Sequence, residues 1–129
     1  GPERSATQIE LAQTDCRNIG INAPVRSSGD TKGTPGVTLR GPNGTLTVPE
    51  GVMIADRHIH MTPAQAAAFG LADGDRVQVR IDGPKPGVMG GVLIRANDKC
   101  ALDFHIDTDD GNAFLLRQGQ LVTVLGKEE

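Results

Sequence analysis

Three histidines are the residues of this chain best suited to chemistry. His58 and His60 are separated by one residue in the segment 57–61, and His105 lies further along the chain. Side chains at positions i and i+2 of a β-strand point to the same face, so both imidazoles can reach one ion. Neutral imidazole nitrogens suit zinc, and His105 would complete a three-histidine site with a fourth position open for water or substrate. The alternative is that these are exposed strand histidines that hold no metal.

His105 has carboxylates close to it in sequence. In the segment 103–107, Asp103 and Asp107 share its face at a period of two. Either carboxylate could therefore orient the imidazole ring by a hydrogen bond.

An internal repeat appears at an offset of 50 residues. Segment 8–11 aligns with segment 58–61, and each is followed by an expected helix, a glycine and a shared arginine. Glu10 falls at the position of His60, and Gln8 falls at that of His58. The repeat predicts a second metal near Glu10, whose other ligands must come from elsewhere.

The elements that must position these residues are short. Two helices are expected. One runs from 62 to 69, with Thr62 as N-cap, Pro63 at the first helical position and Gly70 as C-cap. The other runs from 13 or 14 to 19 and is closed by Gly20. An Asn-Gly pair at 43–44 predicts a hairpin. Strands are expected at 37–40, 45–48, 76–81, 92–95, 101–106 and 120–125.

Composition narrows the function classes. The 129 residues include 17 Gly and 8 Pro, but only 3 Phe and no Tyr or Trp. So much Gly and Pro argues against a helix bundle and for short strands joined by tight turns. The scarcity of aromatics and the net charge of −3 weigh against nucleic acid as a partner. No apolar run approaches the length of a membrane span.

The cysteines and two polar segments have simple interpretations. Cys16 and Cys100 form no C-x-x-C pair and are expected to be free, small, buried residues rather than nucleophiles. Arg57 points to the face opposite the histidines, which favours a structural role or a partner contact. The run 108–112 is expected to be a turn.

The repeat and the segment 70–77 are typical of small six-stranded β-barrels, including double-psi types. The expected fold is therefore mainly β, with two small β-barrel domains and short capping helices, incomplete at the N-terminus.

At this point several motifs come together, in the segments 1–5, 8–10, 33–36, 56–61, 105–109 and 112–113. In this order they resemble the PduL-type phosphotransacylases, the phosphate propanoyltransferases of bacterial microcompartments. The resemblance implies a zinc enzyme that reversibly exchanges CoA and phosphate on a short acyl group. Its partners would be acyl-CoA and phosphate or acyl phosphate, in the bacterial cytoplasm or a microcompartment lumen.

The resemblance also implies roles for individual residues. One zinc would be held by His58, His60 and His105, and a second zinc by Glu10 with ligands that this chain lacks. Arg4 would bind phosphate, and Asn112, again with His105, would contact CoA.

The chain departs from that family in lacking an N-terminal segment with a first H-x-H motif. By the family's layout, residues 1–55 are the remainder of a central barrel, and residues 56–129 are a C-terminal barrel that carries the histidine site and lacks its N-terminal strand. We therefore expect a fragment, or a chain that works with a companion polypeptide. An open strand edge also makes it a candidate for homo-oligomer formation.

A second function class accounts for the strands and histidines equally well. It is a non-catalytic, zinc-binding small β-barrel that serves as an interaction module. It does not account for the matches at Arg4, Glu10 and Asn112. Because no covalent nucleophile is apparent, the enzyme interpretation predicts direct attack by phosphate on the thioester carbonyl.

Overall fold

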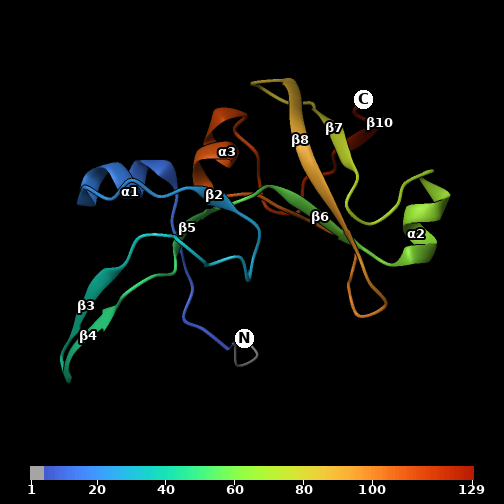
Figure 1. Cartoon of the computed structure of the whole chain (residues 1–129). Helices are drawn as coiled ribbons and strands as arrows, with labels where there is room; N and C mark the ends of the chain where they lie inside the picture. Colours follow the sequence, from blue (N-terminus) through green and yellow to red (C-terminus); the bar gives the residue numbers. More distant parts are fainter. Residues whose placement is uncertain (1–4) are drawn as a thin grey trace. The chain divides into compact units, whose positions relative to one another are not determined.

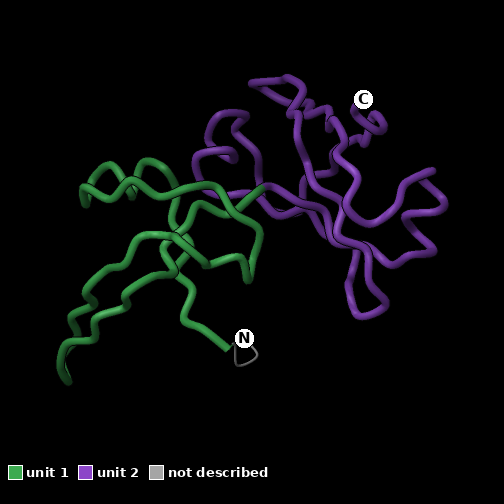
Figure 2. The backbone as a smooth tube through the Cα atoms, in the orientation of Figure 1, with its two compact units in different colours: residues 1–56 green, residues 57–129 purple. Residues whose placement is uncertain are grey.

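The computed structural model describes residues 5–129, and these divide between two compact units, residues 1–56 and residues 57–129 (Figure 2). The chain is mainly β, as expected from its turns and alternating segments. No helix in residues 5–129 is long and apolar enough to cross a membrane. The two units are described one at a time below.

The first unit is built around a short, fully covered strand. Its elements in chain order are β1 (Ile9–Glu10), α1 (Gln13–Ile19), β2 (Val25–Arg26), β3 (Val37–Gly41), β4 (Gly44–Val48) and β5 (Val52–Ala55) (Figure 1). Strand β5 lies between β1 and β2 and runs parallel to both. Its side chains Val52 and Ile54 pack with Cys16 and Ala23 to form the core of this unit.

Strands β3 and β4 form the expected hairpin as a separate two-stranded sheet, closed by residues 42–43. Just before it, Gly36 lies so close to the carbonyls of Val48 and Pro49 that any side chain there would collide with backbone. Close backbone approach is therefore the reason for glycine at position 36.

The second unit is one five-stranded sheet with two short helices. Its elements are β6 (His58–Met61), α2 (Pro63–Ala68), β7 (Arg76–Ile81), β8 (Gly87–Ala96), β9 (Asp103–His105), α3 (Thr108–Ala113) and β10 (Thr123–Lys127). The strand order is β10-β7-β8-β6-β9. Strands β9 and β10 are the two edges, so the sheet is open within the residues described.

One face of this sheet carries the core. In β7, Val77, Val79 and Ile81 are completely buried and alternate with exposed residues, as the period of two predicts. In β6, Ile59 and Met61 are buried and alternate with two half-buried histidines. The opposite face of β6 is left for the two histidines.

Helices begin and end largely where their caps indicate. Thr62 and Gln65 form a capping box at the start of α2, with Pro63 in the first turn. Helix α1 ends at Gly20, which has the left-handed conformation with φ of 75°. At the end of α2, the cap is Phe69, one position before the expected Gly70, which follows in the left-handed conformation with φ of 72°.

The two halves of the predicted repeat share their local structure but not their sheet. Cys16 and Ala66, 50 positions apart, are each buried in a helix, and each accepts a hydrogen bond from the residue after the terminal glycine. However, β2 runs parallel to its central strand β5, whereas β7 runs antiparallel to its central strand β8. Only five residues join β7 to β8, which permits a hairpin, while a parallel pair needs a longer connection.

Four sequence expectations about the strands and turns of this unit were wrong in detail. Strand β8 covers residues 87–96 rather than the expected 92–95. The run 108–112 is not a turn but lies within helix α3, because the Asp107 carboxylate accepts a hydrogen bond from the Asp110 backbone and caps it. Strand β9 covers only three of the six residues expected, and β10 begins three residues later than expected. Both are edge strands, which are held by a neighbour on one side only.

Candidate metal centre

The pairing of β6 with β9 brings the three histidines together. These strands are antiparallel, with His58 opposite His105 and His60 opposite Asp103. Directly opposed residues point to the same face of a sheet. One nitrogen from each of the three imidazoles lies within 4.8 Å of the others, close enough for one ion to be bound by all three.

The rings are arranged around a common point. The Nε2 atoms of His58 and His60 are 3.1 Å apart. The rings of His58 and His105 stack with centroids 5.0 Å apart, and His60 stands nearly perpendicular to both. His58 and His60 are half-buried and His105 is exposed, so an ion here would keep an open side toward solvent or substrate.

The local electrostatics favour the neutral imidazole of His60. Partial burial lowers the pKa of His60, and the neighbouring His58, His105 and Arg95 lower it further, against a smaller opposing effect of Asp103. A neutral imidazole is the form that binds a metal. The donor set therefore fits a divalent ion such as zinc in its chemistry.

Of the two carboxylates expected near His105, only one contacts the ring. An Oδ2 atom of Asp103 lies 3.1 Å from Nε2 of His105. Asp107 instead caps helix α3. The period of two could not separate these alternatives, because the strand ends at His105 and the chain turns before Asp107.

A cysteine takes part in this cluster, which the sequence analysis missed. Both cysteines are free, as expected, and Cys16 is buried. Cys100, in contrast, is half-buried with its Sγ 3.2 Å from Nδ1 of His60. Its position just before β9, the strand with the third histidine, was the only available signal.

Arg57 has a structural role, which was expected from the sequence as the alternative to a partner contact. Its guanidinium donates to both carboxylate oxygens of Asp110, at 3.1 and 2.8 Å, and to the carbonyl of Gly90 at 3.0 Å. Burial raises the pKa of the Asp110 carboxyl, and this effect outweighs the opposite effect of the nearby Arg57 guanidinium, which favours the charged carboxylate. These bonds tie the start of β6 to α3 and β8.

The remaining residues singled out in the sequence lie elsewhere. Glu10 is exposed on β1 in the first unit, where it accepts a hydrogen bond from Gln8. Asn112 is exposed on α3 in the second unit. Arg4 lies outside the described residues.

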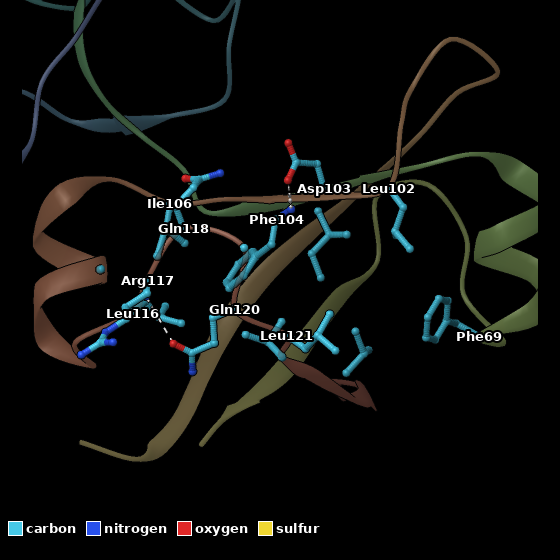
Figure 3. A pocket seen from close by; sticks show the side chains of 15 residues that line it. Phe69, Leu102, Asp103, Phe104, Ile106, Leu116, Arg117, Gln118, Gln120 and Leu121 are labelled. Carbon is cyan, nitrogen blue, oxygen red and sulfur yellow. Dashed lines mark hydrogen bonds between the residues drawn. The ribbon is translucent and has the colours of Figure 1, made fainter. Parts of the chain in front are cut away.

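An apolar hollow of about 490 Å³ lies on the core side of the open sheet (Figure 3). Leu102, Phe104 and Ile106 line it from β9 and its flanks, and Leu121 lines it from the segment before β10. Side chains alternate along a strand, so Phe104 faces this hollow while its neighbour His105 faces the metal cluster. The hollow therefore opens between the two edges of the sheet, and none of the three histidines lines it.

Comparison with known proteins adds an independent line of evidence. The family model for phosphate propanoyltransferase matches residues 1–117. A phosphate propanoyltransferase of Thermotoga maritima is 46% identical over 97% of this chain. Those of Lachnoclostridium phytofermentans and Salmonella typhimurium are 42% and 46% identical over 97% and 88% of it.

The chain spans 60%, 59% and 54% of the lengths of these three relatives. The match includes every residue assigned above to a site, from Arg4 to Asn112. Identity at this level over nearly the whole chain establishes a common family, and it agrees with the motifs in the sequence. The chain belongs to the phosphate propanoyltransferase family.

Proposed function

We propose that this chain carries part of a zinc site at which a short acyl group, propanoyl or acetyl, passes reversibly between CoA and phosphate. The observation that supports it best is the meeting of His58, His60 and His105 on one face of β6 and β9. Membership of the family supports the type of reaction.

His58, His60 and His105 would hold the first zinc. Zinc bound there would supply a Lewis acid that orients phosphate and offsets its negative charge. Three imidazoles leave the fourth position open, as a catalytic site requires. The carboxylate of Asp103 and the thiol of Cys100 would fix the orientations of His105 and His60 from outside the ligand shell.

Glu10 would provide one ligand of a second zinc. Its carboxylate is steadied by Gln8, which also bonds to the loop at 28–29 and so links β1 to that loop. One carboxylate does not hold zinc by itself, so the other ligands would come from outside residues 1–129.

Direct attack by phosphate is the step that we propose. A phosphate oxygen would form a bond to the thioester carbonyl carbon, the carbon–sulfur bond would break, and the CoA thiolate would leave and take up a proton. Arg4 would hold phosphate through its paired N–H groups. Asn112 on α3 and His105 on β9 would contact CoA, and the bond between Arg57 and Asp110 holds α3 in place.

We propose further that the open sheet is completed by a strand from outside this chain, which would close the 57–129 unit into a small barrel. Two edges with unpaired backbone groups, β9 and β10, flank the apolar hollow. An added strand would pair with those edges and cover the exposed Leu102 and Leu121. The strand would belong to a preceding segment of the same protein or to a companion polypeptide. The 1–56 unit would be the remainder of the other barrel.

The site of action that we propose is the bacterial cytoplasm or the lumen of a microcompartment. Acyl-CoA, phosphate and acyl phosphate would be the small-molecule partners. A complementary strand, or a second copy of the chain at the open edge, would be the polypeptide partner.

The direct test measures CoA release from propanoyl-CoA and phosphate, with the zinc content of the same sample. We expect two zinc ions and turnover when the complementary segment is present, and one zinc with little turnover when the 129 residues are alone. One zinc and no turnover in both samples would favour the non-catalytic zinc module. Full turnover by the 129 residues alone would contradict the second zinc site.

A further inference from the structure

The histidine cluster has a cationic neighbour on the same face of the sheet. Strand β8 runs parallel to β6 on the side away from β9, and its Arg95 is in register with His60. Residues in register on adjacent strands point to the same face, and such strands lie about 4.8 Å apart. His60 is therefore flanked by Arg95 on one side and Asp103 on the other.

The guanidinium of Arg95 has no acceptor within residues 5–129: this side chain makes no hydrogen bond and no ion pair there. Of the other four arginines of this unit, three have side-chain partners, and the fourth, Arg117, is exposed. Arg57 bonds to Asp110, Arg76 donates to the carbonyl of Gly91, and Arg80 pairs with Asp82. Arg95 is half-buried, so part of its surface is removed from water without a protein acceptor in return.

With a divalent ion bound, the side chains around the three histidines would leave a net positive charge. Three neutral imidazoles contribute no charge, a divalent ion contributes two positive charges, and Arg95 adds a third. Asp103 supplies one negative charge on this face and is already engaged with His105. An oxyanion with two negative charges, placed between the ion and the guanidinium, would balance the rest.

We propose that Arg95 binds a phosphoryl oxyanion at the histidine cluster. The planar guanidinium presents paired N–H donors that match the spacing of phosphate oxygens. The phosphoryl group would come from inorganic phosphate or acyl phosphate, or from the phosphates of CoA. This assignment rests on the proposed function, and it adds a substrate-binding residue on β8 to those on β6, β9 and α3.

The test is calorimetric titration of the zinc-loaded full chain with inorganic phosphate, with CoA and with pantetheine, which carries no phosphate. Removing charge-assisted hydrogen bonds in Arg95→Gln should weaken binding of the phosphoryl ligand by about 10- to 100-fold and leave pantetheine unchanged. Arg95→Lys keeps the charge but loses the paired donors, so its affinity should lie between the two. Arg80→Gln is the matched control, with the same charge change in the same unit.

The titrations separate the two sources of the phosphoryl group. Weaker binding of inorganic phosphate assigns Arg95 to phosphate or acyl phosphate, and weaker binding of CoA alone assigns it to the CoA phosphates. Wild-type affinities for both in Arg95→Gln would overturn the assignment, as would a wild-type chain that binds neither. If circular dichroism shows that Arg95→Gln does not fold, Arg95→Lys is compared with wild type instead. Unchanged affinity of Arg95→Lys for phosphate and CoA would then overturn the assignment.

Zinc affinity distinguishes an Arg95 that binds phosphate from an Arg95 that only stabilises its strand. Removing a cation beside the ion should leave zinc binding unchanged or tighter in Arg95→Gln, whereas damage to the strand should weaken it. The CoA-release assay, run on the same variants with the complementary segment present, tests the proposed function separately. Absence of turnover with Arg95-dependent phosphate binding would refute that function and leave this inference standing.

Discussion

Each of the three clustered histidines supplies one imidazole, and a site with two imidazoles is too weak to hold zinc firmly. We expect His60→Ala to abolish stoichiometric zinc binding in a competition assay with a chromogenic chelator. Cys100→Ala keeps all three imidazoles and removes only the contact to Nδ1 of His60. It should therefore retain one zinc with about 10-fold weaker affinity. Retention of tight zinc binding by His60→Ala would contradict the three-histidine site.

The lowered pKa of His60 has a consequence for stability in the absence of metal. A histidine whose pKa is lower in the folded state than its ordinary value of 6.5 binds fewer protons when folded than when unfolded. Folding stability should therefore fall as the pH drops below about 6.5. Urea unfolding with a chelator present, between pH 7.5 and 5.5, measures this.

His60→Asn serves as the control for that measurement. Asparagine does not titrate, so the variant should show a shallower loss of stability across the same range. The raised pKa of Asp110 acts in the opposite direction but at more acidic pH, so it does not mask the effect. An equal pH dependence in both proteins would rule out His60 as its source.

Among the elements, helix α3 depends on one ion pair for its attachment to the sheet. Arg57→Ala removes two charge-assisted bonds to Asp110 and leaves that carboxylate partly buried without them, at a cost of about 2 kcal/mol. Arg80→Ala breaks the exposed pair with Asp82 and should cost less than about 1 kcal/mol. Urea unfolding compares the two variants, and equal losses would argue against the attachment.

The elements also show what the sequence could and could not predict. Caps and alternation are local signals, so α1, α2, β7 and the hairpin were predicted close to their observed bounds. Strands β1 and β2 have only two residues each and are defined by their pairing with β5, which no local pattern reveals. Helix α3 is capped by one hydrogen bond from the Asp110 backbone N–H to the Asp107 carboxylate, in a run that otherwise has turn composition.

The same division holds for the candidate site. That His58 and His60 share a face followed from their spacing alone. That His105 joins them depends on the antiparallel register of β6 and β9, a contact between residues 47 positions apart that spacing could not establish. The register of Arg95 with His60 comes from the non-local pairing of β6 with β8, and Cys100 reaches His60 from the loop between β8 and β9.

At the scale of the whole molecule, the three histidines that would hold the first zinc all lie in one unit. One equivalent of zinc should therefore slow amide hydrogen exchange in β6 and β9, because a ligand bound only to the folded state opposes local opening. Exchange in β3 and β4 of the other unit should be unchanged. Hydrogen exchange followed by mass spectrometry measures both regions in one sample. Equal protection of β3 and β4 would show that the two units do not open independently.

Because histidines and buried apolar side chains alternate along β6, the candidate site can form only when this strand pairs in the correct register. If β6 paired with β8 one residue out of register, its imidazoles would turn toward the core, and Ile59 and Met61 would turn toward water. The same error would thus destroy the metal site and the packing at once. Slippage of this strand therefore cannot give a molecule with an intact core and a disabled site. Slipped copies would be unstable and thus subject to degradation by proteases.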